Sequence, residues 1–202
     1  MDRIVIYGCG GHARSIINTL RQNDENMEIL LVDENACNGE VIMGCKVVRD
    51  YKLGKNDGYI IAVGDNEERA RLCQLISKQH RGHCISVVSR YSCIGKESEI
   101  GFGTFISANT YIGPLAKIGN NSIVNTGSII EHETIVGNNA HIAPGATICG
   151  RAQIGNNVFC GAGSVIIDKV KICDNVTIGA GAVVIHDVMD EGTYVGVPAK
   201  IS

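Results

Sequence analysis

A six-residue repeat runs through the second half of the chain and restricts the fold more than any other feature. In steps of six from Ile94 to Val184, 15 of the 16 positions carry Ile or Val, and the remaining position is Cys160. Neither chance nor the 3.6-residue period of an α-helix keeps one register over these 91 residues. The repeat therefore predicts a stack of short strands whose apolar side chains point inward.

A second period, of 18 residues, defines the coil. Ile118-Gly119-Asn120-Asn121 recurs as Val136-Gly137-Asn138-Asn139 and Ile154-Gly155-Asn156-Asn157, with an echo in Ile172-Cys173-Asp174-Asn175. Three hexapeptides thus form one coil with three flat sides, and the Asn-rich corner returns once per coil. Asn tolerates left-handed backbone angles, which suits a tight corner. We expect roughly five coils, joined as parallel strands.

This pattern resembles the left-handed β-helix of the hexapeptide acyltransferases. The resemblance supplies the left hand, which the repeat does not determine and which is an exception to the usual right-handed crossover. It also implies a homotrimer with active sites between adjacent β-helices. A non-catalytic β-solenoid is the alternative.

Residues 1–87 have a different pattern, which predicts a small Rossmann-like parallel α/β domain. Apolar strands and helical stretches alternate, at Ile4–Tyr7, 14–20, Ile29–Val32, 59–63 and 67–78. The predicted fold class is therefore α/β plus all-β. We expect a nucleotide-sugar-binding domain at 1–87, followed at 88–202 by a β-helix domain with a C-terminal tail.

A glycine-rich loop follows the first strand. Gly8-Cys9-Gly10-Gly11-His12-Ala13 fits the G-x-G-x-x-G/A fingerprint, and Asp33 follows about 20 residues later. Such a loop and the helix behind it favour a phosphate. Read alone, the motif indicates NAD, but the domain is short and no dehydrogenase-like segment follows. A nucleotide sugar offers the same pyrophosphate, and a turn without a ligand is the remaining interpretation.

The whole chain resembles the family of sialic acid O-acetyltransferases and bacillosamine-pathway nucleotide-amino-sugar N-acetyltransferases. Three segments carry the resemblance: Gly8-Cys9-Gly10-Gly11-His12, Asn125-Thr126-Gly127-Ser128-Ile129-Ile130-Glu131-His132-Glu133 and Gly196-Val197-Pro198-Ala199-Lys200. The last is common across hexapeptide acyltransferases, and the middle one is the most specific. The resemblance implies acetyl-CoA as the co-substrate.

His132 is the first candidate for a catalytic residue. It lies near a corner and should project outward, and an imidazole can accept a proton near neutral pH. The resemblance makes His132 the general base and Glu133 its support. Consecutive residues of a regular strand point to opposite faces, so this pairing needs a corner geometry. Arg151, 18 residues after Glu133, offers a structural ion pair as the alternative.

The coil period places Gly150, 18 residues after His132, beside it on the next coil. The amide of a glycine is unshielded by a side chain and can donate to the thioester oxygen as negative charge develops. The resemblance assigns the same oxyanion role to Gly150.

Further contacts with acetyl-CoA follow from the resemblance. His141 matches a residue beside the thioester, and a surface histidine in a trimer interface is the alternative. Gly161-Ala162-Gly163 and Gly179-Ala180-Gly181 form a side poor in bulk, along which the pantetheine arm of the cofactor can lie, and corner geometry explains the same pattern. Lys200 is a candidate for the CoA phosphates or a solvated tail lysine.

The resemblance also places the acceptor. It puts Gly10-Gly11-His12 near the sugar or phosphate, Asp33 and Glu34 near the nucleobase or ribose, and Asn125 on the acceptor sugar. Glu34 departs from the aspartate pair that is frequent in the family, which leaves the nucleobase open. A strand-end cap and a corner residue are the structural alternatives for Asp33 and Asn125.

Composition argues against several other classes. A net charge of −3 does not favour nucleic acid, and no apolar run approaches the ~20 residues that span a bilayer. The chain starts with a strand rather than a signal peptide. Nine cysteines without a C-x-x-C pair indicate free thiols and a cytoplasmic location. His80 and His83, beside Cys84, lack further ligands, so no metal site is predicted.

The sequence thus predicts an acetyl-CoA-dependent N-acetyltransferase that acts on a nucleotide-linked 4-amino-4,6-dideoxy sugar for a surface glycan. The carrier is UDP, GDP or dTDP, and the acetyl group moves directly with His132 as base. One alternative is O-acetylation of a sialic acid-like sugar. Another is a non-catalytic trimeric scaffold that binds a nucleotide.

Overall fold

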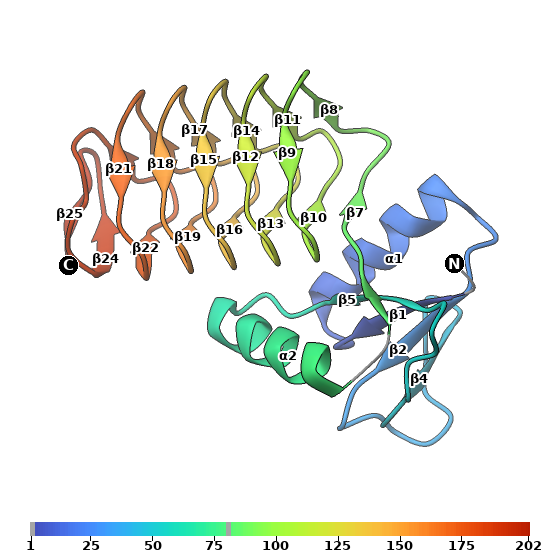
Figure 1. The fold of residues 1–202 in the computed structure, drawn as a ribbon. Coiled ribbons are helices and arrows are strands. Elements are labelled where there is room, and N and C mark those ends of the chain that lie inside the picture. Colours follow the sequence, from blue (N-terminus) through green and yellow to red (C-terminus); the bar gives the residue numbers. More distant parts are fainter. Residues whose placement is uncertain (1–2, 80–81) are drawn as a thin grey trace.

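The computed structural model describes residues 3–79 and 82–202. A small α/β unit forms the N-terminal part, and a long solenoid of short strands continues to the C-terminus (Figure 1). In the part of the chain that the structure describes, no helix is both long and apolar enough to cross a membrane. The predicted fold class is confirmed.

The N-terminal unit is built on one six-stranded sheet with the strand order β3-β4-β2-β1-β5-β6. Its strands are β1 (Ile4–Tyr7), β2 (Ile29–Val32), β3 (Val41–Ile42), β4 (Cys45–Val48), β5 (Gly58–Ile61) and β6 (His83–Cys84). All pairings are parallel except the β3–β4 hairpin, which the sequence did not predict. Strands β1, β2 and β5 are fully buried, as their apolar runs indicate.

Two helices accompany the sheet, α1 (Gly11–Asn23) and α2 (Asn66–Gln79). Both are a few residues longer than the sequence pattern predicts. The carboxylate of Asp65 caps α2 by accepting a hydrogen bond of 2.9 Å from the amide of Glu68. The side chain of Glu68 pairs with Arg71, so the reciprocal half of a capping box is not formed.

The solenoid is a left-handed parallel β-helix with three faces. Face I contains β7 (Val87–Val88), β10 (Phe105–Ile106), β13 (Ile123–Val124), β16 (His141–Ile142), β19 (Phe159–Cys160), β22 (Val176–Ile178), β24 (Gly192–Val195) and β25 (Lys200–Ile201). Face II contains β8 (Cys93–Ile94), β11 (Tyr111–Ile112), β14 (Ile129–Ile130), β17 (Thr147–Ile148), β20 (Val165–Ile166) and β23 (Val183–Val184). Face III contains β9 (Glu99–Ile100), β12 (Lys117–Ile118), β15 (Ile135–Val136), β18 (Gln153–Ile154) and β21 (Lys171–Ile172).

The interior of the β-helix is the predicted column of apolar residues. From Ile106 to Val184, every sixth residue is at most 3% exposed, which confirms the inward direction of these side chains. Ile94 is the exception at 39% exposure, because it lies at the open end of the stack. Strands 18 residues apart pair in register, as Ile112 does with Ile130 and Ile130 with Ile148.

The Asn-rich corner, between faces III and I, has a different task for each of its two asparagines. The second, as in Asn139 and Asn157, adopts a left-handed conformation with φ of 56° and 57°. The first accepts a hydrogen bond from the corner one coil earlier, because the Asn138 amide donates to Oδ1 of Asn156 at 2.8 Å. The expectation from the repeat is therefore confirmed.

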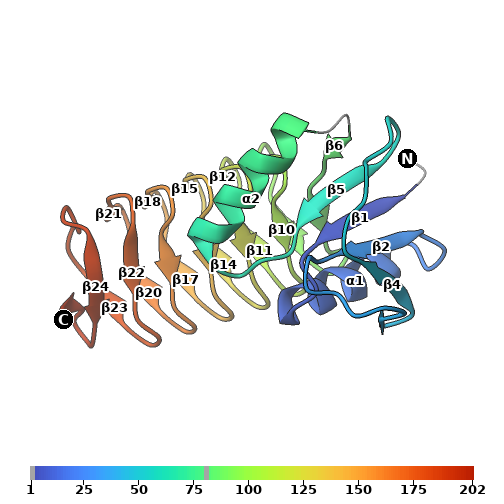
Figure 2. The same cartoon turned by 90° about the horizontal axis from the view of Figure 1, so that it is seen from below.

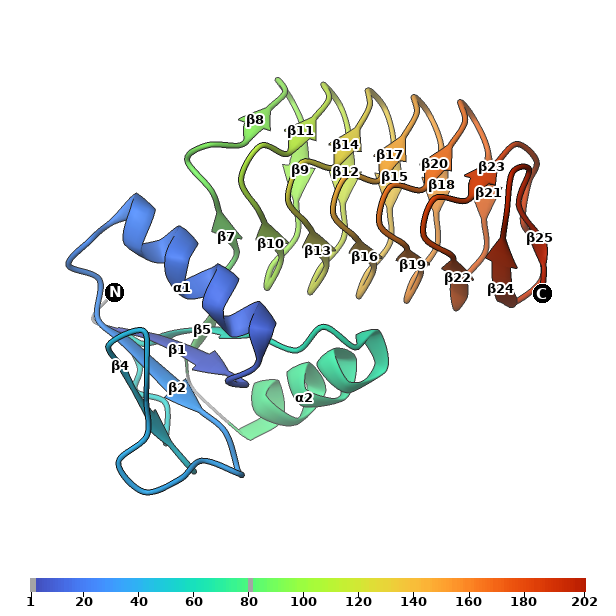
Figure 3. The same ribbon diagram turned by 180° about the vertical axis from the view of Figure 1, so that it is seen from behind.

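The N-terminal unit lies against face I (Figures 2 and 3). Phe105 and Ile123 point away from the β-helix interior, yet each is 1% exposed because the unit covers them. Helix α1 reaches β7, where the side-chain amide of Asn23 donates to the Val88 carbonyl at 2.7 Å. The limit between domains at residues 87 and 88 stays a prediction.

Candidate active site

His132 and Glu133 lie in the corner between faces II and III. Nδ1 of the imidazole is 3.0 Å from Oε2 of Glu133, and about half of each side chain is exposed. Glu133 has a φ of 59°, in the left-handed region, where consecutive side chains are not constrained to opposite faces as they are in a strand. The corner geometry that the pairing requires is therefore present.

The carboxylate determines which nitrogen of His132 is free. A carboxylate can only accept, so Nδ1 carries the proton and donates it to Glu133. Nε2 then carries the lone pair, which is the state that a general base needs.

Gly150 lies directly above this imidazole, on the next coil. A Cβ atom at Gly150 would be 2.7 Å from both Cε1 and Nε2 of His132, so no other residue fits without displacing the ring. The amide of Gly150 is buried, and among the described residues it donates no hydrogen bond. A free donor thus lies beside a free base.

Arg151 does not compete for Glu133. Its Nη2 pairs with Asp168 Oδ1 at 3.1 Å, and the described residues include no ion pair between Arg151 and Glu133. The structural alternative for Glu133 is therefore wrong.

A second group of predicted residues lies where the N-terminal unit meets face I. Nδ1 of His141 is 3.1 Å from the Gly64 carbonyl, and its Nε2 is 3.5 Å from Nδ2 of Asn125. The ring packs edge to face on Phe159 with centroids 5.1 Å apart. Burial lowers the pKa of His141 to about 4, more than the hydrogen bond to Gly64 raises it.

His12, at the start of α1, lies in the same seam. Its ring packs edge to face on Phe105 with centroids 5.2 Å apart. Burial lowers its pKa to about 3, with smaller contributions from His141 and Arg69. Its buried Nε2 has no hydrogen-bond partner. Both seam histidines are thus neutral at pH 7 and can offer hydrogen bonds but no positive charge.

The glycine-rich loop is open toward solvent. Nothing lies within 4 Å of a Cβ built on Gly10 or Gly11, no side chain caps α1, and its first turn has no acidic residue. The loop therefore leaves room for an anion at the helix N-terminus.

Asp33 holds this loop in place. Its carboxylate accepts hydrogen bonds from the Cys9 amide at 3.2 Å and the Asn35 amide at 3.0 Å. Partial burial works to raise the pKa of Asp33, but these hydrogen bonds outweigh it and keep the pKa below its usual value. The structural alternative, a cap at the strand end, is thus present, while Glu34 is exposed.

The candidates for the pantetheine arm lie on the corner between faces I and II. Ala162 and Ala180 are exposed there, one coil apart. Their neighbours Gly163 and Gly181 have φ of 65° and 67°, so corner geometry alone explains these glycines. Lys200 is exposed on β25, which pairs with β24.

One chain does not bring the two groups together. His132, Glu133 and Gly150 lie between faces II and III. Asn125 lies at the corner between faces I and II, and His12 and His141 lie against face I. Face II separates the two groups.

The sequence analysis missed Gly64. Strands β2 and β5 flank β1 on opposite sides, so the loops that follow β1 and β5 open a crevice at their carboxyl ends. Gly64 lies in the second loop and holds His141. The available signal was a strand, a glycine and a helix in sequence, as at Gly8.

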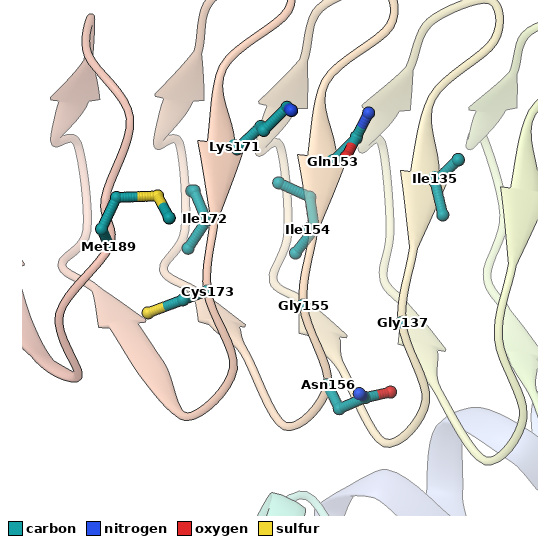
Figure 4. A pocket seen from close by; sticks show the side chains of 10 residues that line it. All are labelled: Ile135, Gly137, Gln153, Ile154, Gly155, Asn156, Lys171, Ile172, Cys173 and Met189. Carbon is teal, nitrogen blue, oxygen red and sulfur yellow. The ribbon is translucent and has the colours of Figure 1, made fainter.

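Two hollows lie near these groups. One, of about 250 Å³, is lined by residues 64–67 and by Asn157, Phe159, Asn175 and Thr177. The other, of about 330 Å³, lies on face III between Ile135 and Met189 and includes none of the predicted site residues (Figure 4). Among the described residues, no group of three or more His, Cys, Asp or Glu side chains could hold a metal, and His80 lies outside them.

Comparison with protein families gave matches to both halves of the chain. Residues 3–76 match the PglD N-terminal domain, and residues 115–150 and 151–186 match the bacterial transferase hexapeptide (six repeats). No curated protein sequence matched significantly.

Solved structures match over nearly the full length. A mutant of GDP-perosamine N-acetyl transferase from Caulobacter crescentus, in complex with CoA and GDP-perosamine, is 26% identical with a TM-score of 0.90, over 99% of this chain and 96% of the other. WeeI from Acinetobacter baumannii is 27% identical with a TM-score of 0.91, over 99% of both chains. The acetyltransferase domain of PglB from Neisseria gonorrhoeae, 23% identical with a TM-score of 0.93 over 100% of both chains, shows the same fold. The chain therefore belongs to the hexapeptide-repeat acetyltransferases that carry a PglD-type N-terminal domain, and it is an enzyme rather than a non-catalytic scaffold.

Proposed function

We propose that the protein transfers the acetyl group of acetyl-CoA to the 4-amine of a nucleotide-linked 4-amino-4,6-dideoxy sugar. The observation that carries the proposal is the contact between the imidazole of His132 and the backbone of Gly150. It places a base and an unpaired N–H donor within one step of each other, as attack by an amine on a thioester requires.

The reaction follows from these positions. Nε2 of His132 takes a proton from the attacking nitrogen as the C–N bond forms, a contribution of roughly 10²–10⁴-fold. The Gly150 amide donates to the oxyanion of the tetrahedral intermediate, which is worth about 3 kcal/mol. When the C–S bond breaks, the thiolate of CoA takes the proton from the imidazolium. Glu133 stabilises that imidazolium and keeps the ring oriented.

The N-terminal unit holds the acceptor. The open amides of Gly10 and Gly11 and the positive end of α1 bind the pyrophosphate. His12, Asn125 and His141 line the path to the sugar with neutral polar groups. Asp33 and Glu34 then face the nucleobase or ribose.

Acetyl-CoA extends along the corner between faces I and II. Ala162 and Ala180 leave space for the pantetheine arm, His141 lies toward the thioester, and Lys200 meets the phosphates at the C-terminal end. The match to a GDP-perosamine N-acetyl transferase that holds CoA supports both ligands.

A homotrimer completes the site. The outward residues of face II are uncharged: Cys93, Tyr111, Ile129, Thr147, Val165 and Val183. Face III instead presents charged residues such as Glu99, Lys117 and Lys171. Three parallel prisms with face II toward a threefold axis bring the corner with His132 of one copy against the Asn125 corner of the next. The two groups that one chain keeps apart then meet.

We expect the enzyme in the cytoplasm. All nine cysteines are free thiols in the structure, which fits a reducing compartment.

A substrate panel tests the proposal. The enzyme is mixed with acetyl-CoA and UDP-, GDP- or dTDP-linked 4-amino sugars, and release of the CoA thiol is followed with a disulfide reagent. We expect release with at least one nucleotide amino sugar and loss of it in His132→Ala. Release with a nonulosonic acid alone would establish the O-acetylation alternative instead.

A further inference from the structure

Arg69, on α2, is the largest fully buried side chain of the described residues, with 1% exposure. A buried guanidinium is costly unless its donors are satisfied, and none of the described carboxylates forms an ion pair with it. Burial lowers the pKa of Arg69 to about 10, against the attraction of Asp65 and Cys73, so the side chain remains charged at pH 7. A charge placed here at such cost needs a structural reason.

The donors of Arg69 reach both parts of the molecule. Toward the N-terminal unit, Nη1 donates to the carbonyls of Val63 and Gly64 at 3.1 and 3.0 Å. Toward the β-helix, Nε donates to the Asn121 carbonyl at 2.8 Å, and Nη2 donates to the Asn139 carbonyl at 2.7 Å. One planar group thus fixes the separation of the two parts.

His141 lies between these contacts. Nη2 of Arg69 is also 3.3 Å from the carbonyl of Ala140, the residue before His141. The Gly64 carbonyl that Nη1 holds is the acceptor for Nδ1 of His141. Arg69 therefore holds the histidine's backbone from one side and its hydrogen-bond partner from the other.

We infer that Arg69 is a positioning residue of the acceptor site, which acts through Gly64 to fix the tautomer and orientation of His141. With its proton held on Nδ1 by Gly64, His141 presents the Nε2 lone pair toward Asn125 and the sugar. This inference rests on the proposed function for the identity of the acceptor. A lysine keeps the charge but, as a point charge, cannot bridge the two parts as a planar fork does.

The test compares Arg69→Lys and Arg69→Met with Arg71→Met, whose side chain is exposed on the same helix and pairs with Glu68. In Arg69→Lys we expect the KM for the nucleotide amino sugar to rise about tenfold or more, with kcat and the KM for acetyl-CoA within about twofold. In Arg69→Met we expect the pKa of His141, measured by NMR titration, to rise from about 4 toward 6.5, because the seam opens and the neighbouring charge is gone. The groups that face His141 there are His12 and Arg69.

Two results would overturn the inference. One is a folded Arg69→Met with an unchanged pKa of His141 and an unchanged KM for the sugar. The other is a parallel loss of kcat, both KM values and melting temperature, which describes a merely structural residue. A wild-type enzyme that ignores nucleotide amino sugars would instead refute the proposed function, and the titration of His141 would still decide the role of Arg69.

Discussion

The imidazole of His132 and the backbone of Gly150 are in contact across two coils, and a Cβ at Gly150 would lie 2.7 Å from Nε2. The stacking of the β-helix sets this relation, since Arg151 donates to the His132 carbonyl at 3.0 Å and so fixes the register of the two corners. The base and the oxyanion donor are therefore aligned by backbone hydrogen bonds.

Gly150→Ala is expected to push the ring of His132 away from the donor. We predict a fall in kcat of about 10²-fold, because both partners of the transition state are displaced. Cys149→Ala, one residue earlier, is the matched control and should stay near wild type. Steady-state kinetics with a melting curve for each variant make the measurement, and a fully active Gly150→Ala would contradict this arrangement.

Glu133→Gln is expected to lower kcat about tenfold or more, because the amide stabilises an imidazolium less well than a carboxylate does. Arg151→Met is the control, since Arg151 forms an exposed ion pair with Asp168, worth at most about 1 kcal/mol. Equal effects of the two substitutions on kcat would assign Glu133 a structural role.

The two seam histidines predict a dependence of stability on pH. Their pKa values, about 3 for His12 and about 4 for His141, lie below the ordinary value of 6.5. Between these limits the unfolded chain binds protons that the native state excludes. The free energy of unfolding therefore falls as the pH drops below 6.5, by roughly 1.4 kcal/mol per pH unit for each histidine.

Denaturant titrations at pH 7.5 and 5 measure this effect. The double variant His12→Asn, His141→Asn should lose a large part of the pH dependence, while the response of carboxylates remains. The same slope in both proteins would show that the histidines titrate freely in the folded state.

Mixed trimers test whether the site is shared between copies. His132→Ala and His141→Ala are each expected to be inactive, but each trimer that contains both chains regains one intact pair of corners. Random mixing should restore about a quarter of the wild-type activity. If mixing restores nothing although hybrid trimers are present by mass spectrometry, each site belongs to one chain.

The β-helix was predictable because its determinants are local and periodic. The six-residue column gave the interior, and the 18-residue period gave the neighbourhood of His132 and Gly150. The orientation of Glu133 was not predictable, since it depends on a φ of 59° at a residue that is neither Gly nor Asn.

The seam was less predictable, for a different reason. The contact of His141 with Gly64 joins residues 77 positions apart, and that of Arg69 with Ala140 joins residues 71 positions apart. Such contacts depend on how the two parts dock, and no repeat in the sequence encodes the docking. Arg69 had no signal at all, because an arginine in a helix is ordinarily exposed.

The most direct test of the catalytic account is the structure of the enzyme with CoA and its nucleotide amino sugar. The account predicts the reacting nitrogen about 2.6–3.2 Å from Nε2 of His132, within hydrogen-bond reach. It also predicts that the Gly150 amide points at the thioester carbon's oxygen. A reacting nitrogen more than about 5 Å from Nε2, with no bridging water, would contradict it.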